Sequence, residues 1–182
     1  MRILTIATAA LIGAAAVTAT LAEEKPLPKG APVLTIAGKT ANWNRGAVKP
    51  EQDAQLKQHD IRFERAMTFD ADMLASMPQY ELRIVTPAGD GTFSGPLLAD
   101  VLKATGAEGA GIRLVGLDGA DTTLKPEELK DQKWILALVG SGKAASAAGF
   151  GPIWLINKPA TDMPSPADMD HWVSSVFYIE VL

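Results

Sequence analysis

The stretch PLLADVLKATGAEGAGIRLVGLDG, residues 96–119, contains both kinds of element that the rest of this chain repeats. Apolar residues recur at helical spacing after Pro96 and stop at Gly106, which predicts a helix over residues 96–105. The apolar segment 112–117 then predicts a strand, which Asp118 and Gly119 close. A short helix and a short strand therefore follow each other within 24 residues.

The same short patterns occur on both sides of this stretch. Residues 42–50 have no periodicity and predict a loop, and the charged segment 51–66 predicts a partly helical excursion on the surface. Asp70 is expected to cap a short helix at its N-terminus. We expect strands at residues 33–37, 79–86, 112–117, 134–139, 153–156 and 173–182, and short helices at 71–76, 125–129 and 167–170. Six or more short strands with few, short helices predict a single domain of the α+β or mostly β class.

The first 22 residues have the composition of a secretory signal peptide. Arg2 precedes an apolar run that extends to about Ala19, and Thr20-Leu21-Ala22 matches a small-x-Ala cleavage site. A transmembrane anchor is the alternative, but the run is rich in Ala and Thr and slightly short for a span. We expect cleavage after Ala22, a leader at 23–32, one domain at 33–182, and a periplasmic protein that is not inserted in the membrane.

Composition limits the chemistry. Removal of Arg2 with the signal changes the formal charge from −4 to −5, and no basic stripe is present, so nucleic acid is not an expected partner. The chain has no cysteine, which removes disulfides, thiolate nucleophiles and thiolate metal ligands. The two histidines, His59 and His171, lie far apart in the sequence. We therefore expect no metal site, and no catalytic motif is recognisable.

The candidate binding residues lie in loops, where binding groups are common. Asn44 and Arg45, in the segment NWNR, offer amide and guanidinium groups that suit a flat heterocycle, although asparagines also form ordinary turns. Asp118 offers a carboxylate or simply shapes its turn. His171 and Trp172 form a hydrogen-bonding and stacking pair or a strand edge. Phe150, in the segment GFGP, offers a stacking face beside glycines that allow close approach.

From Val33 to Leu182 the chain resembles the small exported proteins with a sulfite-oxidase-like, molybdopterin-binding-domain fold. The resemblance rests on six segments in register: LTIAGKTANWNRG (34–46), FERAMTFDADMLASMPQ (63–79), FSGPLLADVLKATGA (93–107), IRLVGLDG (112–119), GFGPIWL (149–155) and HWVSSVFYIEV (171–181). It implies an α+β fold built on a mixed, mostly β sheet with short helices, and a pocket for a pterin system.

Departures from this family concern the metal and the phosphate. Catalytic members use a cysteine as the molybdenum ligand, at a position near Val85 to Pro87 here, and this chain has none. An arginine is frequent where Ala148-Gly149-Phe150 stands, and a tyrosine near Ala120. Loss of the arginine removes a bidentate phosphate contact, which disfavours molybdopterin.

Cysteine-free relatives resemble periplasmic pterin-binding proteins that report to a membrane-bound signalling enzyme. The resemblance implies a non-catalytic protein that binds a reduced pterin or similar heterocycle through Asn44, Arg45, Asp118, Phe150, His171 and Trp172. Its expected partner is the periplasmic domain of a membrane signalling protein. Two alternatives remain open at this point: a molybdopterin-dependent oxidoreductase without the cysteine ligand, and an interaction domain without a ligand.

Overall fold

The computed structural model describes residues 23–86, 89–131, 133–138, 153–158 and 163–182. The expected signal peptide, residues 1–22, lies outside these ranges. The elements are β1 (Glu23–Glu24), β2 (Pro32–Gly38), β3 (Asn42–Trp43), α1 (Ala54–Gln58), β4 (Ala66–Asp70), α2 (Ala71–Ala75), β5 (Gln79–Thr86), β6 (Gly89–Pro96), α3 (Leu98–Ala104), β7 (Ile112–Gly116), β8 (Asp121–Leu124), α4 (Pro126–Asp131), β9 (Trp134–Leu138), β10 (Ile153–Asn157) and β11 (Val176–Val181). The predicted α+β class, rich in strands and with short helices, is confirmed.

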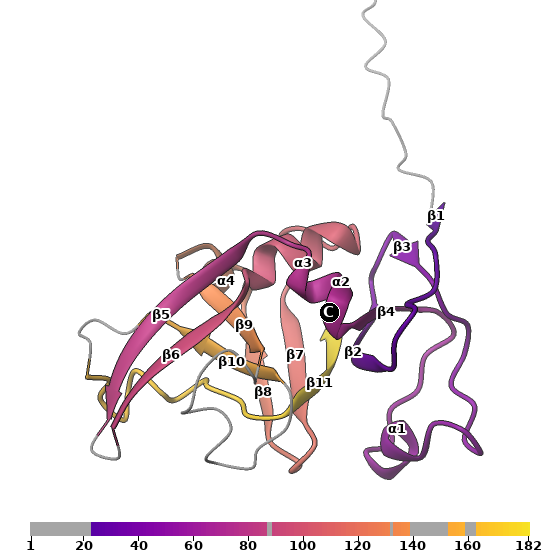
Figure 1. Cartoon of the computed structure of the whole chain (residues 1–182). Coiled ribbons are helices and arrows are strands. Elements are labelled where there is room, and N and C mark those ends of the chain that lie inside the picture. Colours follow the sequence, from indigo (N-terminus) through magenta and orange to yellow (C-terminus); the bar gives the residue numbers. More distant parts are fainter. Residues whose placement is uncertain (1–22, 87–88, 132, 139–152, 159–162) are drawn as a thin grey trace, which may run out of the picture.

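A five-stranded mixed sheet forms the centre of the molecule, with the strand order β4-β2-β11-β7-β8 (Figure 1). The C-terminal strand β11 lies in the middle, parallel to β2 and antiparallel to β7. The outer pairs, β2 with β4 and β7 with β8, are antiparallel. The last strand of the chain thus lies between β2, from the N-terminal part of the chain, and β7, from its middle.

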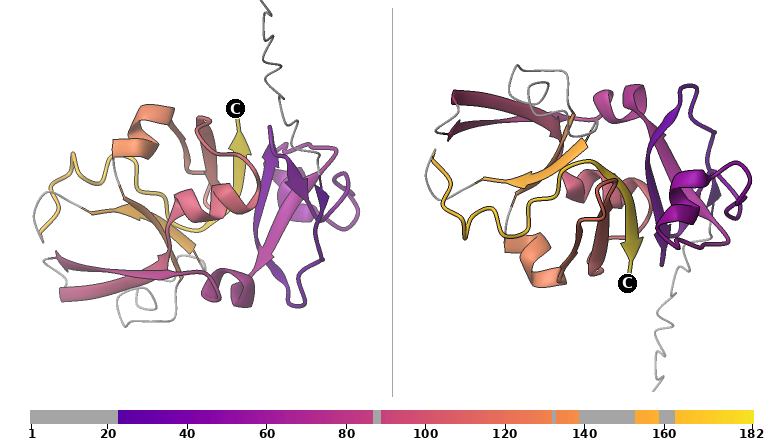
Figure 2. Two further views of the ribbon diagram at one scale, coloured as in Figure 1. Left: turned by 90° about the horizontal axis from the view of Figure 1, so that it is seen from above. Right: turned by 90° about the horizontal axis from the view of Figure 1, so that it is seen from below.

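Two further strand pairs lie at the end of the molecule away from α1 (Figure 2). β5 and β6 form a long antiparallel ribbon, and β9 pairs with β10. β6 packs closely on β9 at Gly95, where an added Cβ would lie 1.9 Å from the carbonyl oxygen of Leu136. A glycine is required at this crossing because no side chain has room there.

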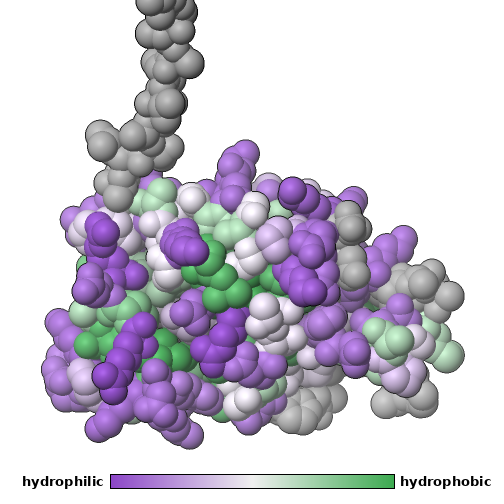
Figure 3. Space-filling model, turned by 180° about the vertical axis from the view of Figure 1, so that it is seen from behind, coloured by the Kyte–Doolittle hydropathy of each residue, from purple (hydrophilic) through white to green (hydrophobic). Residues whose placement is uncertain are grey.

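The main hydrophobic core lies on one face of the five-stranded sheet. It contains residues from this sheet, from α2 and α3, and from the β9–β10 pair, among them Leu34, Leu98, Leu114, Leu136 and Ile179. A smaller core on the other face lies under the segment 46–63. The face of the molecule in Figure 3 is mostly hydrophilic, with hydrophobic residues exposed in patches between polar ones.

The segment before the first long strand is tied to the domain. β1 pairs with β3 in parallel, and the backbone N–H of Gly30 donates to Asp70 at 2.7 Å. The Asn44 side chain donates to the carbonyl oxygen of Pro26 at 3.2 Å. The described part of the leader is therefore held by hydrogen bonds against β3 and β4.

Several element predictions need correction. Pro96 ends β6 rather than starting the helix, which begins at Leu98. The expected strand at 173–182 is regular only over Val176–Val181, because Ser175 has a positive φ and the register shifts after Val176. Near residues 167–170 the chain forms turns and not a helix. Strands β1, β3, β4, β6 and β8 were not predicted. β1 and β3 have two residues each, within the expected leader and loop. The other three are polar or glycine-rich, or lie beside a helix, so alternation does not reveal them.

Candidate functional site

A cleft of about 450 Å³ opens between the α1 segment and the five-stranded sheet. We call it the α1 cleft. It lies at the end of the sheet where β2 begins and β7 ends, and its lining residues come from segments distant in the sequence: Pro32, Val33, Thr35, Arg45, Gln52, Asp53, Ala54, Gln55, Leu56, Leu117 and Phe177. Its volume falls in the range of small-molecule sites in proteins.

An ion pair forms the charged wall of the α1 cleft. Arg45 Nη2 lies 2.6 Å from Asp53 Oδ2, and the two side chains are 20% and 16% exposed. The guanidinium of Arg45 also lies 5.3 Å from the ring centroid of Phe63, which limits its freedom. The pair is therefore partly withdrawn from water and held in one orientation.

Asp53 occupies the N-cap position of α1, but its side chain does not bond to the backbone of that helix. It precedes α1, yet its carboxylate makes no side-chain capping bond and instead accepts from the Lys49 backbone N–H at 2.8 Å. Burial raises the pKa of Asp53, but the Lys49 hydrogen bond and the Arg45 hydrogen bond and charge outweigh it and lower the pKa overall. Oδ2 accepts both of these hydrogen bonds, from Arg45 and from Lys49, so within the described part of the chain Oδ1 accepts none.

Asn44 and Arg45, adjacent in the sequence, have different environments. Asn44 is only 2% exposed, and its amide is saturated by Pro26 and Thr68: it donates to both carbonyls and accepts from the Thr68 N–H and hydroxyl. No hydrogen-bonding capacity is left for a ligand, so we omit Asn44 from the candidate site. Arg45 pairs with Ala66 of β4, which directs its side chain toward the α1 cleft.

Asp118 lies at the rim of the sheet, directly after the cleft residue Leu117. Its two oxygens accept from the Ala120 N–H at 3.0 Å and from the Ser174 hydroxyl at 3.1 Å. The side chain is exposed, and Gly119 adopts a φ of 87° that suits glycine in this turn. The bonds to Ala120 and Ser174 are those of a turn-forming residue, and Asp118 does not line the cleft.

His171 and Trp172 lie on the main-core face of the five-stranded sheet, opposite the face that carries the α1 cleft. Thr122 of β8 pairs with Leu114 of β7, which belongs to the main core, whereas Val115, the next residue of β7, belongs to the smaller core. Thr122 therefore lies on the main-core face of the sheet. His171 contacts this Thr122 at 3.2 Å through Nδ1 and Glu128 at 3.5 Å through Nε2.

The Trp172 indole donates to Asn157 at 2.5 Å and its ring packs against the main core. The structure therefore does not bring these two residues together with Arg45. Phe150 lies outside the described residues.

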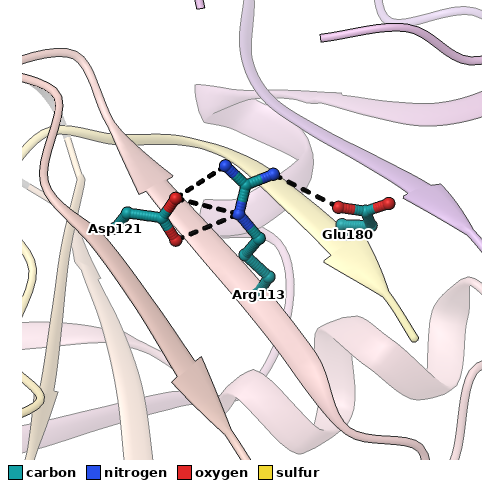
Figure 4. Close-up of polar contacts among 3 residues, drawn as sticks. All are labelled: Arg113, Asp121 and Glu180. Atoms are coloured by element: carbon teal, nitrogen blue, oxygen red, sulfur yellow. Dashed lines mark hydrogen bonds and ion pairs between the residues drawn. The ribbon is translucent and has the colours of Figure 1, made fainter.

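A charged triad that the sequence did not indicate occupies the same sheet face as the smaller core (Figure 4). Arg113 on β7 donates to Asp121 through Nε and Nη2, at 2.6 Å for the shortest contact, and to Glu180 at 3.4 Å. The Asp121 hydrogen bond raises the pKa of Arg113 above its ordinary value. Burial raises the pKa of the neighbouring Tyr178 to about 12. Since all three charged side chains are about 40% exposed, the triad adds little stability.

Four residues that the proposed binding uses were missed by sequence reasoning: Gln52, Asp53, Gln55 and Phe177. Asp53 lay within a segment interpreted only as a surface excursion, and Phe177 within a predicted strand. An aspartate directly before a helix is a recognisable signal, but it predicts a cap and not a cleft. Only the packing of the excursion on the sheet gives Asp53 its position.

The described residues do not fit molybdenum. Val85, near the position of the family's cysteine ligand, has an aliphatic side chain. Within the described ranges, no three His, Cys, Asp or Glu side chains come together as a metal site. The donor set at this position therefore gives no basis for a metal-dependent step.

Comparisons with known proteins add no family. No family model matches the chain, and a search of curated proteins gives no match. Among the residues described, no helix has the length and apolar character needed to cross a lipid bilayer.

Proposed function

We propose that this protein binds a flat heterocycle of the pterin class in the α1 cleft and does not transform it. The observation that carries the proposal is the Arg45–Asp53 pair at the wall of a preformed cleft. Asp53 Oδ1 is available to accept from the amino and ring N–H groups of such a ligand. The Gln52 and Gln55 amides suit a keto edge, and Phe177 offers an aromatic surface.

The electrostatics of the cleft favour binding over acid–base chemistry. A general acid or base works best when its pKa lies near the working pH. The pKa of Asp53, the only carboxylate in the lining, is lowered from an already acidic ordinary value. Asp53 therefore remains a charged hydrogen-bond acceptor at neutral pH and a weak base.

The wider assignment belongs to the same proposal. We infer a sulfite-oxidase-like fold, supported by the mixed sheet and by six sequence segments in register with that family. The composition of residues 1–22 supports a periplasmic location. The resemblance supports, as partner, the periplasmic domain of a membrane signalling enzyme that responds to the bound ligand.

Calorimetric titration with 7,8-dihydrobiopterin tests the proposal. Asp53→Asn retains the shape of the side chain and removes its charge, so we expect at least about tenfold weaker binding. Asp118→Asn is the matched control at the exposed turn, and we expect it to bind as the wild type does. If Asp118→Asn weakens binding and Asp53→Asn does not, the ligand binds at the Asp118 turn, and the assignment to the α1 cleft is wrong.

Metal analysis of natively purified protein separates the two functional classes. Stoichiometric molybdenum would support an oxidoreductase and contradict a binding protein. Mass spectrometry of small molecules released from the same sample would identify a retained heterocycle. Absence of dihydrobiopterin binding, together with no retained molecule, would favour an interaction domain.

A further inference from the structure

A second cavity lies between α3 and α4, apart from the α1 cleft and not required for pterin binding. It has a volume of about 340 Å³. Its residues, none shared with the α1 cleft, are Leu97, Leu98, Ala99, Leu102, Glu108, Gly109, Pro126, Leu129, Lys130, Lys133 and Trp134. We call it the α3–α4 groove. Its size is at the lower end for small-molecule sites, so it suits a small ligand.

The floor of the groove is apolar. Leu98 and Leu102 of α3 are buried, and Trp134 at the start of β9 is only 3% exposed. The Trp134 indole N–H is already used, because it donates to the carbonyl oxygen of Glu128 at 3.1 Å. Above this buried floor, Leu97, Pro126 and Leu129 of the lining are partly exposed. These three side chains offer hydrocarbon surface for an apolar ligand.

Two lysines give the groove a positive charge. Lys130 and Lys133 are both exposed, and neither has an ion pair or a side-chain hydrogen bond among the residues the structure describes. Glu108 is the acidic residue of the lining. Its Oε1 lies 3.9 Å from Nζ of Lys103, a residue that does not line the groove. Within the described part of the chain, the two ammonium groups therefore have no anionic partner.

We propose that the α3–α4 groove binds a medium-chain fatty acid. The hydrocarbon chain would lie against Leu97, Pro126 and Leu129, and the carboxylate would meet Lys130 and Lys133. Lysine donates as a compact point charge, which suits a single carboxylate without fixed bidentate geometry. Each methylene that enters the groove would strengthen binding about fourfold.

Calorimetry with octanoate below its micellar concentration tests the assignment on the full chain. We expect saturable binding, about 15-fold weaker binding of hexanoate, which lacks two methylenes, and no comparable binding of octylammonium. Lys130→Gln combined with Lys133→Gln should weaken octanoate binding about tenfold or more. The matched control, Lys39→Gln with Lys57→Gln, removes the same charge at exposed sites outside the groove and should leave the affinity unchanged.

A second variant tests the location independently of charge. Ala99 is an exposed residue of the groove lining, so Ala99→Phe should fill the groove without disturbing the buried core. We expect it to abolish octanoate binding while the melting temperature stays close to that of the wild type. The proposal is overturned if octanoate does not bind, if octylammonium binds equally well, or if affinity persists in both groove variants.

Discussion

A single buried amide, that of Asn44, joins three segments of the chain. It connects the leader through Pro26 and strand β4 through Thr68 to the loop that carries Arg45. Every donor and acceptor of this side chain has a partner, as buried polar groups require. Asn44 therefore positions Arg45 for the α1 cleft without contacting the cleft itself.

Asn44→Ala should therefore destabilise the protein strongly. It leaves the Thr68 N–H and two carbonyl groups without their partners, and we expect a loss of about 3 kcal/mol in the free energy of unfolding. Urea denaturation measures this loss. Asn42→Ala is the control. The Asn42 side chain donates one hydrogen bond among the described residues, to the carbonyl oxygen of Ala104 at 2.9 Å, so its loss should cost about 1 kcal/mol. Equal losses for the two variants would contradict this assignment.

At the scale of elements, Asp70 links α2 to the leader. One oxygen caps α2 by accepting from the Met73 N–H at 2.8 Å, and the other accepts from the Gly30 N–H. The hydrogen bonds from Gly30 and Met73 lower the pKa of Asp70 below its ordinary value of 3.8. A lowered carboxyl pKa stabilises the fold above the ordinary pKa, and this contribution is lost as the pH falls through the lower, folded-state value.

Asp70→Asn should lower the melting temperature at pH 7 and reduce its dependence on pH below about pH 4. The melting temperatures of variant and wild type should converge as the pH falls through the lowered pKa of Asp70, because protonation removes the charge from the wild type as well. Calorimetric melts across this range provide the measurement. Asp72→Asn, at an exposed position in the first turn of the same helix, should change little. A pH-independent difference for Asp70→Asn would count against the mechanism.

The packing of the β5–β6 ribbon depends on Gly95. An added Cβ would lie 1.9 Å from the Leu136 carbonyl oxygen and 2.7 Å from its carbonyl carbon, both rigid backbone atoms. Gly95→Ala should separate β6 from β9 and cost about 3 kcal/mol, measured by urea denaturation. Gly46→Ala, where an added Cβ has no neighbour within 4 Å, should change stability by less than about 0.5 kcal/mol. Wild-type stability in Gly95→Ala would show that the two strands can separate at little cost.

At the scale of the whole molecule, the main core spans elements from both ends of the chain. Leu34 of β2, Leu98 of α3, Leu136 of β9 and Ile179 of β11 belong to one buried cluster. A shared core couples these elements, so we expect them to unfold in one transition. Residues 46–63 pack instead on the smaller core, on the other face of the sheet.

Leu98→Ala should lower stability by about 2–5 kcal/mol, because Leu98 is fully buried in the main core. The midpoint of the unfolding transition should be lowered equally when followed by far-ultraviolet and by near-ultraviolet circular dichroism, which report on secondary structure and on aromatic packing respectively. Leu27→Ala, at a side chain 68% exposed, is the control and should differ little from the wild type. Two separated transitions would mean that the strand pairs and the five-stranded sheet unfold independently.

The amino-acid sequence by itself determined the α+β class, the strands β2, β5, β7 and β9, and the short helix capped by Asp70. These features depend on local periodicity and on capping, which act within a few residues. It also determined the absence of cysteine chemistry.

Only the tertiary structure decided which loop residues meet. Asp53 and Arg45 face a common cleft with Phe177, 124 positions beyond Asp53, because β11 inserts between β2 and β7. Asn44, adjacent to Arg45 in the sequence, instead becomes a buried connector. His171 and Trp172 precede β11 and lie on the side of the sheet away from the α1 cleft. Their position follows from tertiary contacts with Thr122 of β8 and Asn157 of β10, which local sequence does not reveal.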